Sequence, residues 1–103
     1  MTPTPQETWR QVPPVARSEA ARLARSRRAL GEFLVEQFDQ TFHRHVDEVL
    51  FETFPDGLYA TLYVEGVAVA SHNVWAVDMA SALSDAGVEV HVVVRSSSDR
   101  IDR

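Results

Sequence analysis

The hexapeptide HRHVDE, residues 43–48, brings together two histidines and two carboxylates, the side chains that most often bind divalent metals or carry protons. Apolar residues recur every three or four positions between Leu34 and Val49, which predicts that the hexapeptide lies on a helix. Successive helical residues turn by about 100°, so His43 and His45 point about 200° apart. The two histidines therefore cannot bind one metal ion together.

A smaller metal candidate remains, in which His43 pairs with Asp39 or Asp47, each four residues away on the helix. Such a pair could hold a divalent ion if another segment supplied a third ligand. We favour a solvated acidic face, on which a charged His43 gains a few tenths of a kcal/mol from its neighbours. His45 falls at the edge of the apolar stripe and is interpreted as a packing or interface residue. We therefore predict no metal site and no cofactor.

A second group that could transfer protons is Tyr59, His72 and His91. The predicted strands place Tyr59 opposite His72 and bring His91 or Val93 close to both. No carboxylate is obviously placed to orient these rings. The interpretation that we favour is an aromatic and histidine interface, because such side chains supply rigid contact area with a polar tip.

The third group is the arginine run RLARSRR, in which Arg22 and Arg25 share a helix face that Arg28 continues. Such a stripe could bind nucleic-acid phosphates or an acidic protein surface. Residues 1–28 hold six arginines and two glutamates, a count of +4, whereas the remainder holds four arginines and thirteen acids, a count of −9. This asymmetry indicates a polar molecule that could stack head to tail or bind an anionic partner at its basic end, and it fits a solvated basic helix start equally well.

Several classes of function lack their motifs. The chain has no cysteine and no lysine, and it contains no GxGxxG, GxxxxGK[ST] or GxSxG sequence. No apolar run reaches 18 residues, so we expect no membrane partner, and the N-terminus lacks the apolar core of a secretory signal. We expect a protein of the cytoplasm or of an assembled particle.

The elements that position these side chains follow from the apolar periodicity. Ser18, a good N-cap residue, begins a helical pattern that runs to about Thr53, where FPDG ends it. This helix is either continuous or broken at Gly31. The later predicted elements are a hairpin at 58–72 with its turn at Glu65-Gly66, a helix at 73–86 and a strand at 88–94.

The order α–β–β–α–β predicts an α+β fold with a three-stranded antiparallel sheet in the spatial order 2-1-3. Both helices are expected on one face of the sheet, which leaves the other face open. We predict a single domain at 18–95, preceded by a proline- and arginine-containing arm at 1–17 and followed by a polar tail at 96–103. Trp9 on the arm is a candidate docking anchor.

The prediction of function is a non-enzymatic structural, assembly or adaptor subunit that forms a homo-oligomer or docks in a larger complex, for example a virus particle. The alternatives are a nucleic-acid-associated protein that uses the helix Arg17–Arg28, and a small metal-dependent or acid–base enzyme. The predicted interface residues are Trp9, Arg22, Arg25, Arg28, His45, Tyr59, Tyr63, His72, Val74, Val77, His91 and Val93.

Overall fold

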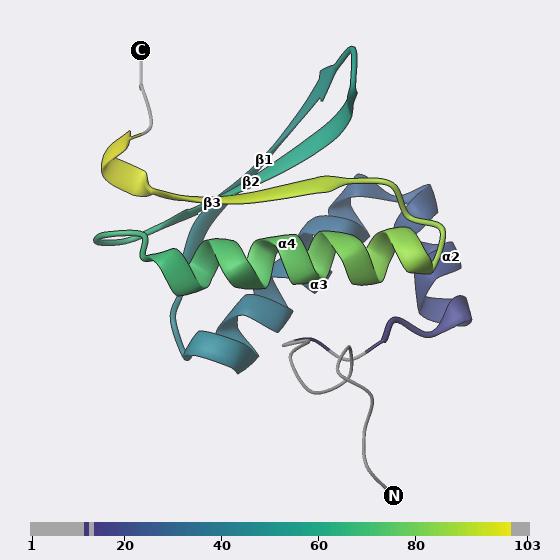
Figure 1. Ribbon diagram of the computed structural model, residues 1–103, viewed down its shortest axis with the longest axis horizontal. Coiled ribbons are helices and arrows are strands. Elements are labelled where there is room, and N and C mark those ends of the chain that lie inside the picture. Colours follow the sequence, from purple (N-terminus) through teal and green to yellow (C-terminus); the bar gives the residue numbers. More distant parts are fainter. Residues whose placement is uncertain (1–11, 13, 100–103) are drawn as a thin grey trace, which may run out of the picture.

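The computed structural model describes residue 12 and residues 14–99, and Figure 1 shows their arrangement. The α+β class and the element order α–β–β–α–β are confirmed. Trp9, most of the predicted arm and residues 100–103 of the tail lie outside the described residues. The elements are α2 (Arg17–Arg25), α3 (Arg27–Phe42), β1 (Val46–Phe54), β2 (Gly57–Val64), α4 (Ala70–Asp85), β3 (His91–Ser96) and a 3₁₀ turn at Ser97–Asp99.

The N-terminal helical segment is broken, but at Ser26 and not at Gly31. Ser26 adopts an extended conformation, with φ −143° and ψ 116°, which ends α2 and begins α3. Its hydroxyl accepts a hydrogen bond from the Ala29 N–H at 3.1 Å and so satisfies one of the free N–H groups of the first turn. Gly31 lies inside α3, where a Cβ atom would meet the Phe51 ring at 3.3 Å. The glycine therefore permits close packing of the helix on β1.

The prediction that this helix continues to Thr53 is wrong. Helix α3 ends at Phe42, and His43 follows in the left-handed conformation, with φ 54°. Residues 46–54 instead form β1, which pairs antiparallel with β2 across the two-residue turn at 55–56. The apolar residues of this stretch have helical spacing, and pairing with the partner strand overrides that local pattern.

The predicted hairpin around Glu65-Gly66 is also wrong, because residues 65–69 form a loop and α4 begins at Ala70. Strand β2 nevertheless lies in the centre of the sheet and pairs with the last strand, as predicted for 58–64. The sheet order is β1-β2-β3, and β2 and β3 run parallel, so the prediction of a wholly antiparallel sheet is wrong. The physical reason is the connection: a helix that crosses between neighbouring strands returns the chain in the same direction.

The core lies between the helices and one face of the sheet. Leu30, Leu34 and Phe38 line α3 at every fourth position and are at most 2% exposed. The sheet contributes Ala60, Leu62 and Val64 from β2, as predicted, together with Val92 and Val94 from β3. On α4 the buried apolar residues are Trp75, Ala76, Met79, Ala82 and Leu83.

Figure 1 shows that α2, α3 and α4 all lie on one side of the sheet. No described helix covers the other side, which we call the outer face. No helix in the described part of the chain has both the length and the apolar composition that crossing a bilayer requires.

Candidate functional site

The outer face is a grid of nine side chains, three from each strand, in which residues that are paired in register form rows. We call these the end row, the middle row and the loop row. The end row lies next to the β1–β2 turn, and the loop row lies next to the 65–69 loop. The end row is Glu52, Tyr59 and His91; the middle row is Leu50, Thr61 and Val93; the loop row is Glu48, Tyr63 and Arg95.

The centre of the outer face is the most shielded part of it. Thr61 is 9% exposed although no described helix lies over it, because its neighbours in the grid surround it. Tyr59, Tyr63, Leu50 and Val93 are half-buried. The face is thus aromatic and aliphatic in the middle, with charged residues on its two outer strands. Half-buried aromatic and aliphatic side chains with charged neighbours are typical of a surface that binds a protein partner.

Tyr59 is the anchor of the end row. Its ring stacks on His91, with centroids 4.5 Å apart and an interplanar angle of 24°, so the predicted proximity of these two residues is confirmed. Phe54 packs edge-on against the same ring at 5.2 Å. The Tyr59 hydroxyl donates a hydrogen bond to the Asp56 carboxylate at 2.6 Å. Tyr59 is therefore held in one orientation by three neighbours.

This hydrogen bond moves both titrations away from neutral pH. It lowers the pKa of Asp56 and raises the pKa of Tyr59, in each case as the largest cause. A general acid or base works best with a pKa near the operating pH. The Asp56–Tyr59 pair thus positions a side chain and is not tuned for proton transfer.

His72 does not belong to this group, and its predicted place opposite Tyr59 is wrong. It lies in the first turn of α4, is 2% exposed, and packs edge-on against Phe42 and Phe38. Its Nδ1 accepts a hydrogen bond from the Val69 N–H at 3.2 Å, which caps the helix. Burial, and secondarily the charge of Arg44, lowers the pKa of His72. The residue is a neutral structural histidine.

The HRHVDE segment is not helical, so its predicted geometry is wrong. His43 is the cap of α3 and donates its backbone N–H to the Asp39 carbonyl. Asp47 sits in β1 at the register shift between Val46 and Glu48, and its carboxylate accepts a hydrogen bond from Ser97. The His45 side chain is 82% exposed and lies 3.8 Å from Asp47. Within the described residues no three potential ligands converge on a metal position.

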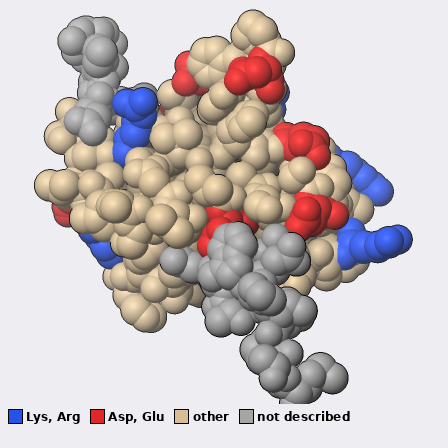
Figure 2. All heavy atoms as spheres, in the orientation of Figure 1, with Lys and Arg blue, Asp and Glu red and all other residues tan. Residues whose placement is uncertain are grey.

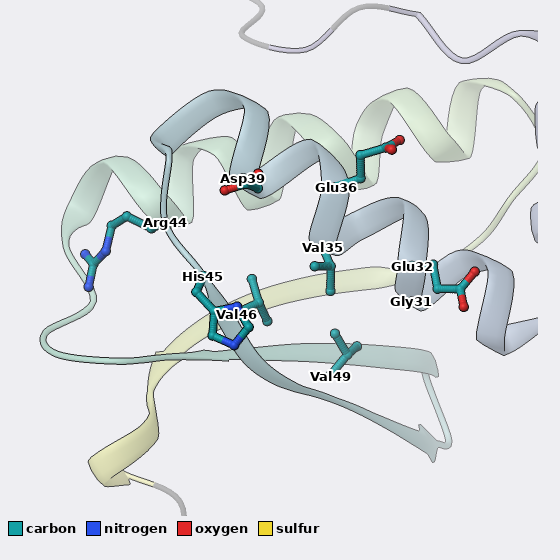
Figure 3. Close-up of a pocket in the computed structure, with 9 residues that line it drawn as sticks. All are labelled: Gly31, Glu32, Val35, Glu36, Asp39, Arg44, His45, Val46 and Val49. Carbon is teal, nitrogen blue, oxygen red and sulfur yellow. The ribbon is translucent and has the colours of Figure 1, made fainter.

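A groove of about 480 Å³ lies between α3 and the edge strand β1. Figure 3 shows Val35 and Val49 facing one another across it, with Glu32, Glu36 and Asp39 along the helix. Arg44 points away, and its guanidinium donates to the Glu65 carbonyl. The groove has an apolar floor and an acidic wall, which favours a cationic over an anionic occupant.

The arginine stripe is interrupted by the break at Ser26. Arg22 pairs with Glu19, and Arg28 pairs with Glu32 at 3.3 Å on the following helix. Both pairs are exposed, so each contributes about 0.5 kcal/mol at most. Figure 2 shows basic and acidic side chains close together at the end of the molecule where α2 lies. Arg22, Arg25 and Arg28 thus do not form one continuous basic face.

Val74 and Val77 lie on the solvent side of α4, as predicted, and are 49% and 66% exposed. Figure 2 looks onto this side and shows a surface with few charged side chains. Val67 and Val69, in the loop before α4, add to the exposed apolar area. This stripe is a second surface that a partner could cover.

Comparisons with known proteins leave the function to be argued from this geometry. No family model, curated protein or solved structure matches the chain. The residues of the outer face are therefore the basis for any functional assignment.

Sequence reasoning missed the contribution of β1 to the outer face, namely Glu48, Leu50 and Glu52. It also missed Asp56 as the partner of Tyr59. A signal for both is present in FPDG, because proline, aspartate and glycine between two β-rich runs are typical of a hairpin turn. The helical periodicity before FPDG favours a helix end there instead, and that interpretation conceals the turn.

Proposed function

We propose that this protein is a non-enzymatic assembly or adaptor subunit, and that the outer face of its sheet is the surface on which a protein partner docks. One observation carries the proposal: all described helices pack on one side of the sheet, while the other side presents tyrosines and aliphatic side chains in register. A sheet face that no described helix covers, and whose tyrosines and aliphatic side chains are half-buried among charged neighbours, offers a surface that a protein partner can cover. The proposed partner covers it.

The chemistry of the other groups supports a binding role over a catalytic one. The Asp56–Tyr59 hydrogen bond moves both pKa values away from neutrality, and His72 is buried as a helix cap. The arginines of α2 and α3 are partly paired with glutamates, which weakens the case for a phosphate-binding stripe. No separate observation favours nucleic acid or a substrate.

Site-specific photo-crosslinking in the native host tests this proposal, because it captures whichever protein lies against the outer face. Tyr63 on the outer face is replaced by p-benzoylphenylalanine, and the matched control carries the same residue at Gln40, which is exposed on α3. We expect a discrete protein adduct from position 63 on irradiation and none from position 40. Adducts of equal yield at both positions, or none at either, would contradict the proposal.

A further inference from the structure

We infer that the outer face docks on the same face of a second copy of this chain, around a two-fold axis that runs parallel to the strands. This inference rests on the proposed function and names the partner. It is carried by the distribution of charge over the three rows of the outer face.

The two outer strands carry opposite charges on this face. Strand β1 contributes the carboxylates of Glu48 and Glu52, whereas β3 contributes the guanidinium of Arg95 and, in the end row, the imidazole of His91. The central strand contributes the aromatic residues Tyr59 and Tyr63. Because adjacent strands are about 4.8 Å apart, the acidic and basic columns are separated by roughly 10 Å.

Two copies can meet face to face around an axis that lies over β2 and parallel to it. This rotation exchanges the outer strands, so β3 of each copy lies over β1 of the other, and every row meets its own counterpart. Arg95 then faces Glu48 of the second copy, and His91 faces Glu52 of the second copy. By symmetry each contact occurs twice, as in any isologous interface.

The other face-to-face arrangement has its axis across the strands, and the charges oppose it. That rotation leaves each outer strand over itself and exchanges the end row with the loop row. Glu48 would face Glu52, which brings two carboxylates together twice, and Arg95 would face His91 and lose its carboxylate partner. Juxtaposed like charges disfavour an interface, so the charge pattern selects the parallel axis.

The middle row provides the apolar contact in the selected arrangement. Leu50 of each copy faces Val93 of the other, and Thr61 faces its own counterpart on the axis. Packed sheets lie about 10 Å apart, which allows these side chains and the tyrosines to interdigitate. The face is small, about 15 Å by 17 Å from strand spacing and rise. Its area is below that of a permanent dimer, so the complex is transient.

Charge reversal tests the arrangement, because it predicts which two variants complement one another. Arg95→Glu places a glutamate opposite Glu48, and Glu48→Arg places an arginine opposite Arg95. Each variant alone therefore has two repulsive contacts in its homodimer. An equimolar mixture can form a heterodimer in which both contacts are attractive. Sedimentation velocity from about 10 µM to about 1 mM covers the range of a transient complex.

We expect wild-type protein to self-associate, each single variant to dissociate at least about tenfold more readily, and the mixture to recover the wild-type affinity. The double variant, with both reversals in one chain, should also recover it. Recovery should weaken at high salt, because exposed charges are screened. Circular dichroism and thermal melts check that each variant folds.

Two results would overturn the inference. Neither of them would by itself contradict the proposal that a protein partner docks on the outer face. Wild-type protein that self-associates while neither the mixture nor the double variant recovers affinity would exclude this axis. Wild-type protein that stays monomeric throughout would exclude a second copy as the partner. In that second case a photo-adduct with a different protein would still support docking on the outer face.

Discussion

At the scale of single residues, the environment gives the four histidines different roles. His72 is 2% exposed and caps α4, whereas His43 and His45 lie at the exposed end of α3 and His91 stacks on Tyr59. Residue type and spacing could not predict this difference, because it depends on where α4 begins. Once Ala70–Asp85 is helical, His72 faces Phe38 and Phe42 and must be neutral.

The buried state of His72 predicts that stability falls on acidification. Burial lowers its pKa in the folded protein below the ordinary value of 6.5, so the unfolded chain takes up the proton at higher pH. The stabilisation by neutral His72 is complete above that ordinary value and is lost as pH falls through it towards the folded pKa. Urea unfolding between about pH 5.5 and 7.5 should show a free energy of unfolding that decreases with acidity.

The matched variants are His72→Gln, which keeps an acceptor for the Val69 N–H, and His43→Gln at an exposed position. Glutamine at position 72 should remove most of the decrease between these pH values, and glutamine at position 43 should leave it in place. A decrease that survives in His72→Gln would show that another group is responsible.

At the scale of elements, the sequence predicts which segments are regular better than it predicts where they end. The strand at 58–64 and the inward positions Val88, Val90, Val92 and Val94 are as predicted, because alternation is strong there. The prediction for 46–54 is wrong because the apolar residues of that stretch have helical spacing although the segment is a strand. Its strand identity depends on pairing with β2, a long-range contact that no local pattern contains.

The break between α2 and α3 gives a local test of this description. Ser26→Ala removes the hydroxyl that accepts from the Ala29 N–H, and we expect a loss of about 1 kcal/mol in the free energy of unfolding. Ser18→Ala is the control, because Ser18 lies within the first turn of α2, is exposed, and is not the cap residue. Denaturant unfolding should show almost no change for this second variant. Equal losses at both positions would contradict the assigned break.

At the scale of the whole molecule, the existence of an open sheet face is predictable from the sequence. The complete set of side chains on that face is not. Alternation within two strands assigns Tyr59, Tyr63, His91 and Val93 to that face. The acidic column of β1 escapes prediction, because the apolar periodicity favours a helix in that stretch. Without Glu48 and Glu52 the face has no carboxylate that could pair with Arg95 of a second copy, so its complementarity is invisible.

The most direct test of docking on the outer face compares two identical substitutions on opposite sides of the molecule. Val93→Arg puts a charge into the middle row, and Val77→Arg puts the same charge on the solvent side of α4. In a sedimentation concentration series we predict that Val93→Arg abolishes self-association while Val77→Arg retains the wild-type behaviour. Loss of association in Val77→Arg with retention in Val93→Arg would contradict the account and assign the interface to α4.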